Sequence, residues 1–157
     1  MFKKFIGKIK LKDEIIIMDQ YSNLDQRFSE IDFLKLNIKP DNYKCFIKKR
    51  RKGKIKELIL SIDNLINDEM FMFNYSIFLD HGVLFLCNKE DFKENKAKYD
   101  SIDFAKYIYN KINNKKNKFK FLLNDFNLFL NINKKDICYN VFVKKENNQI
   151  TGIKIKF

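Results

Sequence analysis

The sequence contains few of the residues from which catalytic and metal sites are usually built. Its 157 residues include one histidine, four glycines and no tryptophan. The glycines are isolated from one another, so no glycine-rich loop that could cradle a phosphate is present. A zinc site would need cysteine and histidine clustered along the chain, and no such cluster occurs. These absences predict a protein without a metal or a cofactor.

Cysteine is also scarce and gives no sign of a disulfide framework. Cys45, Cys87 and Cys138 are odd in number and widely spaced. Each lies in an apolar, strand-like context, so we expect three buried, reduced thiols. Reduced thiols are typical of the cytoplasm. The basic N-terminal segment is followed by no apolar run of the signal-peptide type, and this also favours a cytoplasmic protein.

Proline and long apolar runs are nearly absent. Pro40 is the only proline, and no linker rich in proline or serine divides the chain. We therefore expect a single domain over residues 1–157, a length that suits one hydrophobic core. The longest uncharged stretch, Met70 to Leu79, is too short to span a bilayer. The sequence thus predicts no membrane partner.

The charge balance is strongly positive, and two interpretations compete for it. Lysine and arginine number 32 against 20 acidic residues, which gives a net charge of +12. Such a charge is typical of proteins that bind polyanions. However, Arg27, Arg50 and Arg51 are the only arginines, and arginine is the better phosphate ligand. The excess of lysine is therefore also explained by the residue bias of an A+T-rich genome, and this explanation is favoured.

Alternation of apolar and polar residues predicts a domain made mostly of strands. It is clearest at the C-terminus, where residues 136–146 and 149–157 flank an Asn147-Asn148 turn. The residues expected to face the core in this hairpin are Tyr139, Val141, Val143, Ile153, Ile155 and Phe157. Further strands are expected at 5–11, 14–18, 31–38, 43–49, 54–62, 70–79, 83–87, 118–123 and 126–132.

Some segments allow more than one interpretation. Residues 43–62 could form an amphipathic helix, but Gly53 between two apolar runs favours a hairpin. Residues 70–88 are interpreted as a hairpin or a bent strand. Ser101 is placed to cap a helix over 101–113, and 89–100 is a candidate short helix. The predicted fold is α+β, with about ten mostly antiparallel strands and one main helix, and two packed sheets are one arrangement that the pattern allows.

The strongest charged feature is a run of basic residues at the predicted 48–56 hairpin. Its members are Lys48, Lys49, Arg50, Arg51, Lys52 and Lys54, and Lys56 continues it. A hairpin tip would present them as an exposed cationic knob for phosphates or for an acidic protein surface. The competing explanation is a solvated turn. Stacking on bases would need aromatic residues as well, and the nearby Tyr43 and Phe46 are interpreted more simply as core residues.

The only histidine lies in the triplet Asp80-His81-Gly82. His81 would be a general base if a carboxylate oriented it. Adjacent residues of a strand face opposite sides, so Asp80 is a poor candidate for that role, and in a turn both residues are often only solvated. The sequence therefore favours a non-enzymatic protein, and no catalytic residue is assigned.

The order of several short motifs resembles a bacterial family of uncharacterised domains, the domain of unknown function 4241 family. The segments that carry the resemblance are Gly7 to Asp19, Pro40 to Tyr43, Asp80 to Asn88, Asp136 to Phe142, and Gln149 to Phe157. The first is similar to an opening strand pair of that family. The positions that match its motifs are Asp80, Gly82, Asp136 and Tyr139. Asn88 stands where the family has an acidic residue, and the resemblance implies no known activity.

Three functions remain open after this reading of the sequence. The first is a non-enzymatic cytoplasmic binding protein, most concretely an immunity or antagonist protein that occludes a toxin or a defence nuclease. The second is a nucleic-acid-binding module that uses the basic 48–56 hairpin. The third is an enzyme with a site around Asp80 and His81. A protein partner is favoured over nucleic acid because a small domain without an evident catalytic group suits an antagonist. The predicted fold does not by itself imply a function.

Overall fold

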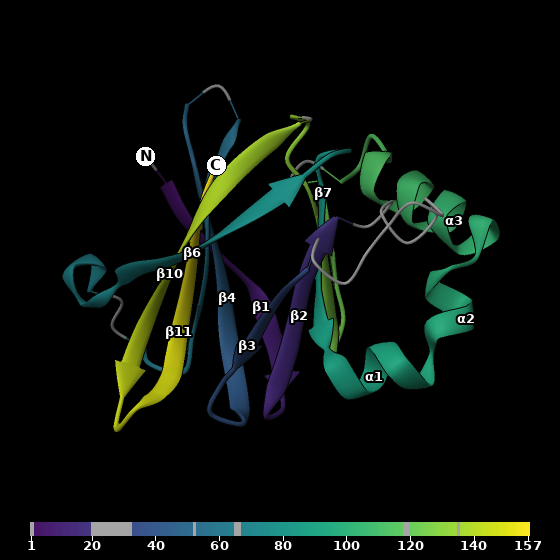
Figure 1. Ribbon diagram of the computed structural model, residues 1–157. Helices are drawn as coiled ribbons and strands as arrows, with labels where there is room; N and C mark the ends of the chain where they lie inside the picture. Colours follow the sequence, from purple (N-terminus) through teal and green to yellow (C-terminus); the bar gives the residue numbers. More distant parts are fainter. Residues whose placement is uncertain (1, 20–32, 52, 65–66, 118–119, 135) are drawn as a thin grey trace.

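The computed structural model describes residues 2–19, 33–51, 53–64, 67–117, 120–134 and 136–157 (Figure 1). Some predicted features lie outside this range. They are Lys52 in the basic run and the beginnings of the strands expected at 31–38 and 118–123.

Two antiparallel sheets form the body of the protein (Figure 1). The strands of the six-stranded sheet are, in spatial order, β1 (Phe2–Leu11), β4 (Asp41–Lys49), β5 (Ile55–Ser61), β11 (Gln149–Lys156), β10 (Ile137–Glu146) and β6 (Met72–Leu79). The strands of the five-stranded sheet are β3 (Leu34–Asn37), β2 (Glu14–Asp19), β7 (Val83–Asn88), β9 (Asn127–Asn131) and β8 (Phe121–Leu123). The α+β prediction, with mostly antiparallel strands in two sheets, is confirmed.

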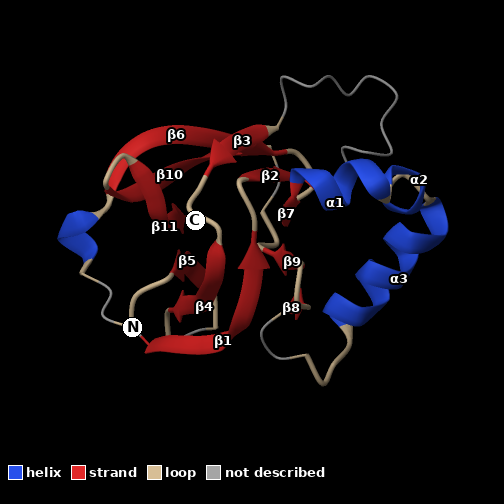
Figure 2. Ribbon diagram, turned by 90° about the horizontal axis from the view of Figure 1, so that it is seen from below, coloured by secondary structure: helices blue, strands red, loops and turns tan. Residues whose placement is uncertain are grey.

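Three helices lie on the outer side of the five-stranded sheet (Figure 2). They are α1 (Lys89–Glu94), α2 (Lys96–Tyr99) and α3 (Ile102–Asn113). The Ser101 side chain accepts a hydrogen bond from the backbone N–H of Phe104, so the predicted N-cap of the main helix is confirmed. Ile108 and Ile112 then face the sheet and are buried. A short 3₁₀ helix, η3 (Asp68–Met70), lies beside the six-stranded sheet (Figure 2).

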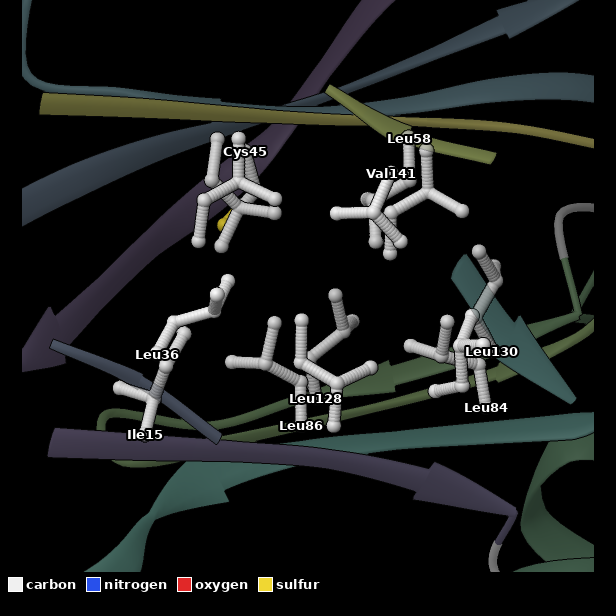
Figure 3. Packing of buried hydrophobic residues seen from close by; sticks show 14 of the residues in the cluster. Ile15, Leu36, Cys45, Leu58, Leu84, Leu86, Leu128, Leu130 and Val141 are labelled. Atoms are coloured by element: carbon white, nitrogen blue, oxygen red, sulfur yellow. The ribbon is translucent and has the colours of Figure 1, made fainter. Parts of the chain in front are cut away.

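The hydrophobic core lies between the two sheets (Figure 3). Leu58 and Val141 point into it from the six-stranded sheet, and Leu86 and Leu128 point into it from the other sheet (Figure 3). A second core under the helices is largely aromatic and includes the stacked rings of Phe85 and Phe129. Strands β2, β7 and β9 are thus covered on both faces, which explains why they read as continuous apolar runs.

The hairpins predicted at 43–62 and at the C-terminus are both present. Strand β4 pairs with β5, and β10 pairs with β11. Asn147 and Asn148 both have positive φ, which a tight turn between two twisted strands requires. Tyr139, Val141 and Val143 face the core as predicted.

The prediction of a hairpin or bent strand over 70–88 is wrong. Strand β6 ends the six-stranded sheet beside β10, whereas β7 is central in the other sheet. Residues 80–82 therefore carry the chain from one sheet to the other. The first two strands, β1 and β2, are also divided between the sheets and are not paired with each other. Because both segments of each pair are apolar on the core side, their alternation does not reveal that they belong to different sheets.

The prediction of three buried cysteines is also only partly right. Cys45 and Cys87 are buried, but Cys138 is exposed. Cys138 lies opposite Phe78 in the β10–β6 ladder and adjoins the inward-facing Tyr139. Side chains alternate along a strand, so Cys138 faces away from the core.

Candidate functional site

The face of the six-stranded sheet that points away from the core carries several aromatic and basic side chains. We call it the outer face. The three helices lie on the opposite side of the molecule (Figure 2). Among the described residues, the segment around η3 is the part that covers this face, with Phe71 packed over Gly152. The centre of the outer face is buried as well, with Ile59 and Lys154 only 0% and 4% exposed, so its open parts lie toward β1 and toward β6.

One cross-strand row on the outer face is built mainly from phenylalanine. Consecutive ladder pairs define its members, which are Phe5, Phe46, Ile59, Lys154, Phe142 and Phe73. We call this set the aromatic row. Phe5 and Phe73 at its two ends are 49% and 57% exposed. The ring centroids of Phe5 and Phe46 are 5.5 Å apart, and those of Phe73 and Phe142 are 5.6 Å apart.

Lysines flank the aromatic row and lie against its rings. Lys3 Nζ is 5.1 Å from the ring centroid of Phe46, and Lys156 Nζ is 4.9 Å from that of Phe142. Lys8 and Lys44 form a ladder pair on the other side of the row. The ammonium groups thus border aromatic surfaces at distances where a cation–π interaction is favourable. The outer face combines positive charge with flat apolar rings.

The acidic residues at this face are joined to lysines in ion pairs. Lys48 Nζ lies 3.0 Å from a carboxylate oxygen of Glu57. Lys144 contacts Asp63 and lies 2.8 Å from Glu146. The hydrogen bond to Asp63, followed by the one to Glu146, raises the pKa of Lys144. These contacts favour the positively charged form of the lysine. The carboxylates therefore neutralise Lys48 and Lys144 and leave the lysines beside the aromatic row in excess.

The predicted basic hairpin is present, but its members have different environments. Arg50, Arg51 and Lys54 are exposed at the tip. Lys48 is paired with Glu57, and Lys49 is partly buried. Burial lowers the pKa of Lys49, and the nearby charge of Lys4 adds to the effect. The charge that is available at the tip comes from Arg50, Arg51 and Lys54.

The structure brings one further lysine, Lys134, close to the end of the basic run at Lys56. The pKa of Lys56 is lowered, mainly by the charge of Arg50 and then by partial desolvation. Lys134 and Lys54 lower it further through their own charges. Arg50, Lys54, Lys56 and Lys134 are therefore close enough to repel, and we call them the cationic cluster. Lys134 lies in the β9–β10 connection, far along the chain from the basic run. The sequence therefore could not show that Lys134 lies near that run.

The positions singled out by the family resemblance separate into two places. The backbone N–H of Asp136 donates a hydrogen bond of 3.2 Å to the carbonyl oxygen of Asp80. Gly82 has a φ of +79°, and a Cβ there would lie 2.4 Å from the carbonyl oxygen of Lys134. These three positions thus meet at one crossing of loops. Tyr139 instead lies in the core, with its ring against that of Phe157 at 5.2 Å.

A buried carboxylate that was not singled out from the sequence holds His81. Asp19 is 1% exposed, and its Oδ2 accepts hydrogen bonds from the backbone N–H groups of His81 and Gly82 at 2.8 and 3.0 Å. Its Oδ1 lies 3.3 Å from Nδ1 of His81, whereas Asp80 lies 3.7 Å from that nitrogen. Of these two carboxylates, Asp19 at the end of β2 lies nearer to the imidazole, and its hydrogen bonds go to the backbone of the turn.

His81 lies at the rim of a groove of about 730 Å³ between α3 and the sheet edge. We call it the His81 groove. Its apolar part comes from Val83, Ile102 and Ala105. The polar groups that line it are Lys106, Tyr109, Asn110, Asn113, Asn131 and Asn133. A ligand here would meet amides, a phenol, an ammonium and an imidazole over a small apolar floor, which is typical of sites for small polar molecules.

No family model matches the chain, and no curated protein or solved structure matches it either. The resemblance to the domain of unknown function 4241 family therefore stays a prediction. Among the residues that the structure describes, no helix has the length and apolar character needed to cross a membrane. Within the same residues, no cluster of three or more histidine, cysteine or acidic side chains is arranged to hold a metal ion. The function must therefore be argued from the outer face and the groove.

Proposed function

We propose that this protein binds single-stranded nucleic acid on the outer face of its six-stranded sheet. The observation that carries the proposal is the aromatic row bordered by lysines. Proteins that bind single strands use aromatic side chains on which bases stack and positive groups that follow the phosphates. Both groups occur here on one face of the sheet, and the two ends of the aromatic row are exposed.

The dimensions of the face suit a short single strand. Neighbouring strands of a sheet lie about 4.8 Å apart, so the aromatic row extends over about 24 Å from β1 to β6. Phe46 and Phe142 are separated by β5 and β11 and stand about 14 Å apart by the same spacing. Because Ile59 and Lys154 between these rings are buried, bases would stack toward the two ends of the row, near Lys3 at one end and near Lys156 at the other. A double helix offers its bases only at groove edges, and a broad sheet face does not enter a groove.

The experiment is a binding titration with end-labelled oligo(U) and oligo(dT) of matched length, followed by fluorescence anisotropy at several salt concentrations. We expect binding at low salt and a negative slope of log K against log salt. Phe46→Ala and Phe142→Ala should each weaken binding by about 1–3 kcal/mol, the range for loss of one stacked base. Lys156→Gln should weaken binding less and reduce the salt slope by about 0.7.

The matched control is Tyr107→Ala, which removes an exposed ring from α3 on the other side of the molecule. It should bind like the unchanged protein. Absence of binding at low salt would refute the proposal. Equal weakening by Tyr107→Ala and Phe142→Ala would refute the location on the outer face.

The antagonist role stays a second candidate, because one observation favours a protein partner. Strand β6 is an edge of the six-stranded sheet and exposes Met72, Phe73 and Phe78. An exposed apolar edge strand can pair with a strand of another protein. Capture of the tagged protein from its own cells, with and without nuclease, separates the two roles. A stoichiometric protein that survives nuclease supports the antagonist in the cytoplasm, and bound nucleic acid that is lost in high salt supports the first proposal.

A further inference from the structure

We infer that Asn140 selects the base of the bound strand at the β6 end of the aromatic row, and that the base it selects is adenine. The inference rests on the proposed function, since it needs a single strand on the outer face. It goes further, because the proposed function assigns no sequence preference. Its starting point is a difference between the side chains that border the two ends of the aromatic row.

At the β1 end, the pair of Phe5 and Phe46 is bordered by basic side chains on the outer face. The ladder pairs on its two sides consist of lysines, which are Lys3 with Lys48 and Lys8 with Lys44. An ammonium group donates hydrogen bonds and carries a positive charge, so it binds the phosphate of any nucleotide. Contacts to phosphates position a strand but carry no information about its sequence. The β1 end is therefore suited to holding the backbone of the strand.

At the β6 end, an asparagine and a serine lie beside the rings. Asn140 and Ser76 form a ladder pair, and the next outward-facing pair of the same two strands is Phe142 with Phe73. Side chains alternate along a strand, so Asn140 lies on the same face as Phe142. Both Asn140 and Ser76 are exposed. Lys156, the ladder partner of Asn140 on β11, provides a positive charge beside them for a phosphate.

The side chain of Asn140 is free to bind a ligand. Within the described part of the chain, the structure has no hydrogen bond to the carboxamide of Asn140 or to the hydroxyl of Ser76. The nearby Asn74, which is the extra residue at the bulge of β6, instead donates from its side chain to the carbonyl oxygen of Met72 at 3.3 Å. Asn140 is therefore the better candidate for hydrogen bonds to a base.

Exposed rings lie on both sides of Asn140 along the β6 edge. Phe73 is 57% exposed and Phe78 is 44% exposed. Their ladder partners, Phe142 and Cys138, are four residues apart on β10, which corresponds to about 14 Å. Successive stacked bases are only roughly 3.4 Å apart, so a base has room to stack on either ring with its edge toward Asn140.

Adenine is the base whose two exposed edges both match a carboxamide. Its 6-amino group is a donor, and an acceptor nitrogen lies beside that group on either edge, N1 on one and N7 on the other. A carboxamide offers an acceptor oxygen and N–H donors that complement this pattern. Guanine has acceptors alone on its N7 edge, and the pyrimidines have no N7 edge. Asparagine is accordingly a common partner of adenine in base recognition.

The test uses short fluorescein-labelled RNAs of one length, each an oligo(U) in which one central position is A, C, G or U. Anisotropy titrations at low salt measure the affinity of the full chain for each RNA. We expect the RNA with adenine to bind about fivefold or more tightly than oligo(U). Asn140→Ala should still bind RNA and should lose this difference.

A fifth RNA separates hydrogen bonding from stacking. It carries purine, which is adenine without the 6-amino group, at the central position. Purine keeps the two fused rings that stack but loses the donor that a carboxamide oxygen accepts. The unchanged protein should therefore bind this RNA more weakly than the RNA with adenine, and Asn140→Ala should bind the two alike. The four affinities form a double-mutant cycle for the contact between Asn140 and the amino group.

The matched control is Asn42→Ala. Asn42 is another exposed asparagine of the six-stranded sheet, but it lies opposite Lys10 at the start of β4, away from the exposed rings. This variant should keep the full preference for adenine. Lys156→Gln should weaken binding to all of the RNAs alike, since a phosphate contact carries no base preference. Thermal melting confirms that each variant is folded.

The outcomes separate this inference from the proposed function. Equal binding of the RNAs overturns the selection by Asn140 and leaves the binding function in place. A preference for adenine that Asn140→Ala retains comes from stacking and also overturns the inference. A preference for another base overturns the assignment of adenine. Failure of every RNA to bind at low salt overturns both proposals.

Discussion

Asp19 and His81 lie 62 residues apart in the chain, yet one carboxylate both fixes the backbone of the histidine and faces its ring. Oδ2 accepts the backbone N–H groups of His81 and Gly82, and Oδ1 lies 3.3 Å from Nδ1. Asp19 ends β2 of the five-stranded sheet, and His81 lies where the chain crosses to that sheet from β6. Asp19 thus secures the crossing between the sheets through its hydrogen bonds to the backbone of the turn.

Replacement of Asp19 by alanine should destabilise the fold. Two buried backbone N–H groups would lose their acceptor, at a cost of roughly 3 kcal/mol in the free energy of unfolding. Asp80→Ala is the matched control, because its side chain is exposed and its change should stay within about 0.5 kcal/mol. Urea denaturation of both variants provides the measurement. Equal losses for the two would show that Asp19 does not secure the crossing.

Gly82 and Gly53 form a natural pair for a test of backbone strain. Their φ angles are +79° and +78°, so alanine is strained at either position, by about 1 kcal/mol or somewhat more. A Cβ at Gly82 would also meet the Lys134 carbonyl, whereas nothing lies within 4 Å at Gly53. Gly82→Ala should therefore lose roughly 2 kcal/mol more than Gly53→Ala, because the backbone of the loop must move. Thermal unfolding of both variants checks this, and similar melting temperatures would contradict the close approach.

Tyr43 should link stability to alkaline pH. Its buried hydroxyl donates to the carbonyl oxygens of Lys39 and Ile150 at 2.8 and 3.0 Å, and burial, followed by the charge of Asp41, raises its pKa. A phenol with a raised pKa stabilises the fold fully below about pH 10, its unfolded value, and this stability is lost as pH rises further.

The corresponding variant is Tyr43→Phe. At neutral pH it should be about 1 kcal/mol less stable than the unchanged protein, because two carbonyl groups lose their donor. The difference should shrink above about pH 10, since the variant has no phenol to ionise in the unfolded chain. Chemical denaturation across this pH range measures it. A difference that stays constant with pH would refute the linkage, and Tyr107→Phe on the surface should show no difference at any pH.

The cysteines should differ sharply in reactivity. Burial raises the pKa of the Cys45 thiol to about 12, and burial together with the charge of Asp91 raises the pKa of Cys87 as well. Thiolates are the reactive form, so iodoacetamide at mild pH should modify Cys138 alone in the folded protein and all three thiols in denaturant. Mass spectrometry of the adducts gives the count, and Cys138→Ser should abolish labelling of the folded chain.

The same thiol also reports on the proposed interface. Cys138 lies on the outer face opposite Phe78, near the start of β10. Bound oligo(U) should slow the modification of Cys138. The same oligonucleotide at high salt, where binding is lost, should leave the rate unchanged. An unchanged rate under conditions where anisotropy shows binding would place the bound strand elsewhere.

The positions of the strands and of the main helix follow from local sequence. Alternation at Tyr139, Val141 and Val143 placed the core side of β10, and Ser101 placed the start of α3. These signals are local because strand and helix periodicity depend on residues within a few positions of each other. The prediction of an α+β fold with mostly antiparallel strands is confirmed for the same reason.

The distribution of strands between the sheets and the composition of the two candidate sites were decided by tertiary structure. Phenylalanine is apolar on either face, so Phe46 was interpreted as a core residue until the register of β4 against β1 and β5 placed it outside. Asp19 follows an apolar run, so the sequence alone indicates only the end of a strand there. Its contact with His81 depends on the path of the chain after β6. The sequence by itself determined the local elements and the excess of positive charge. Only the long-range strand pairing, which joins residues far apart in the chain, decided which side chains share a face.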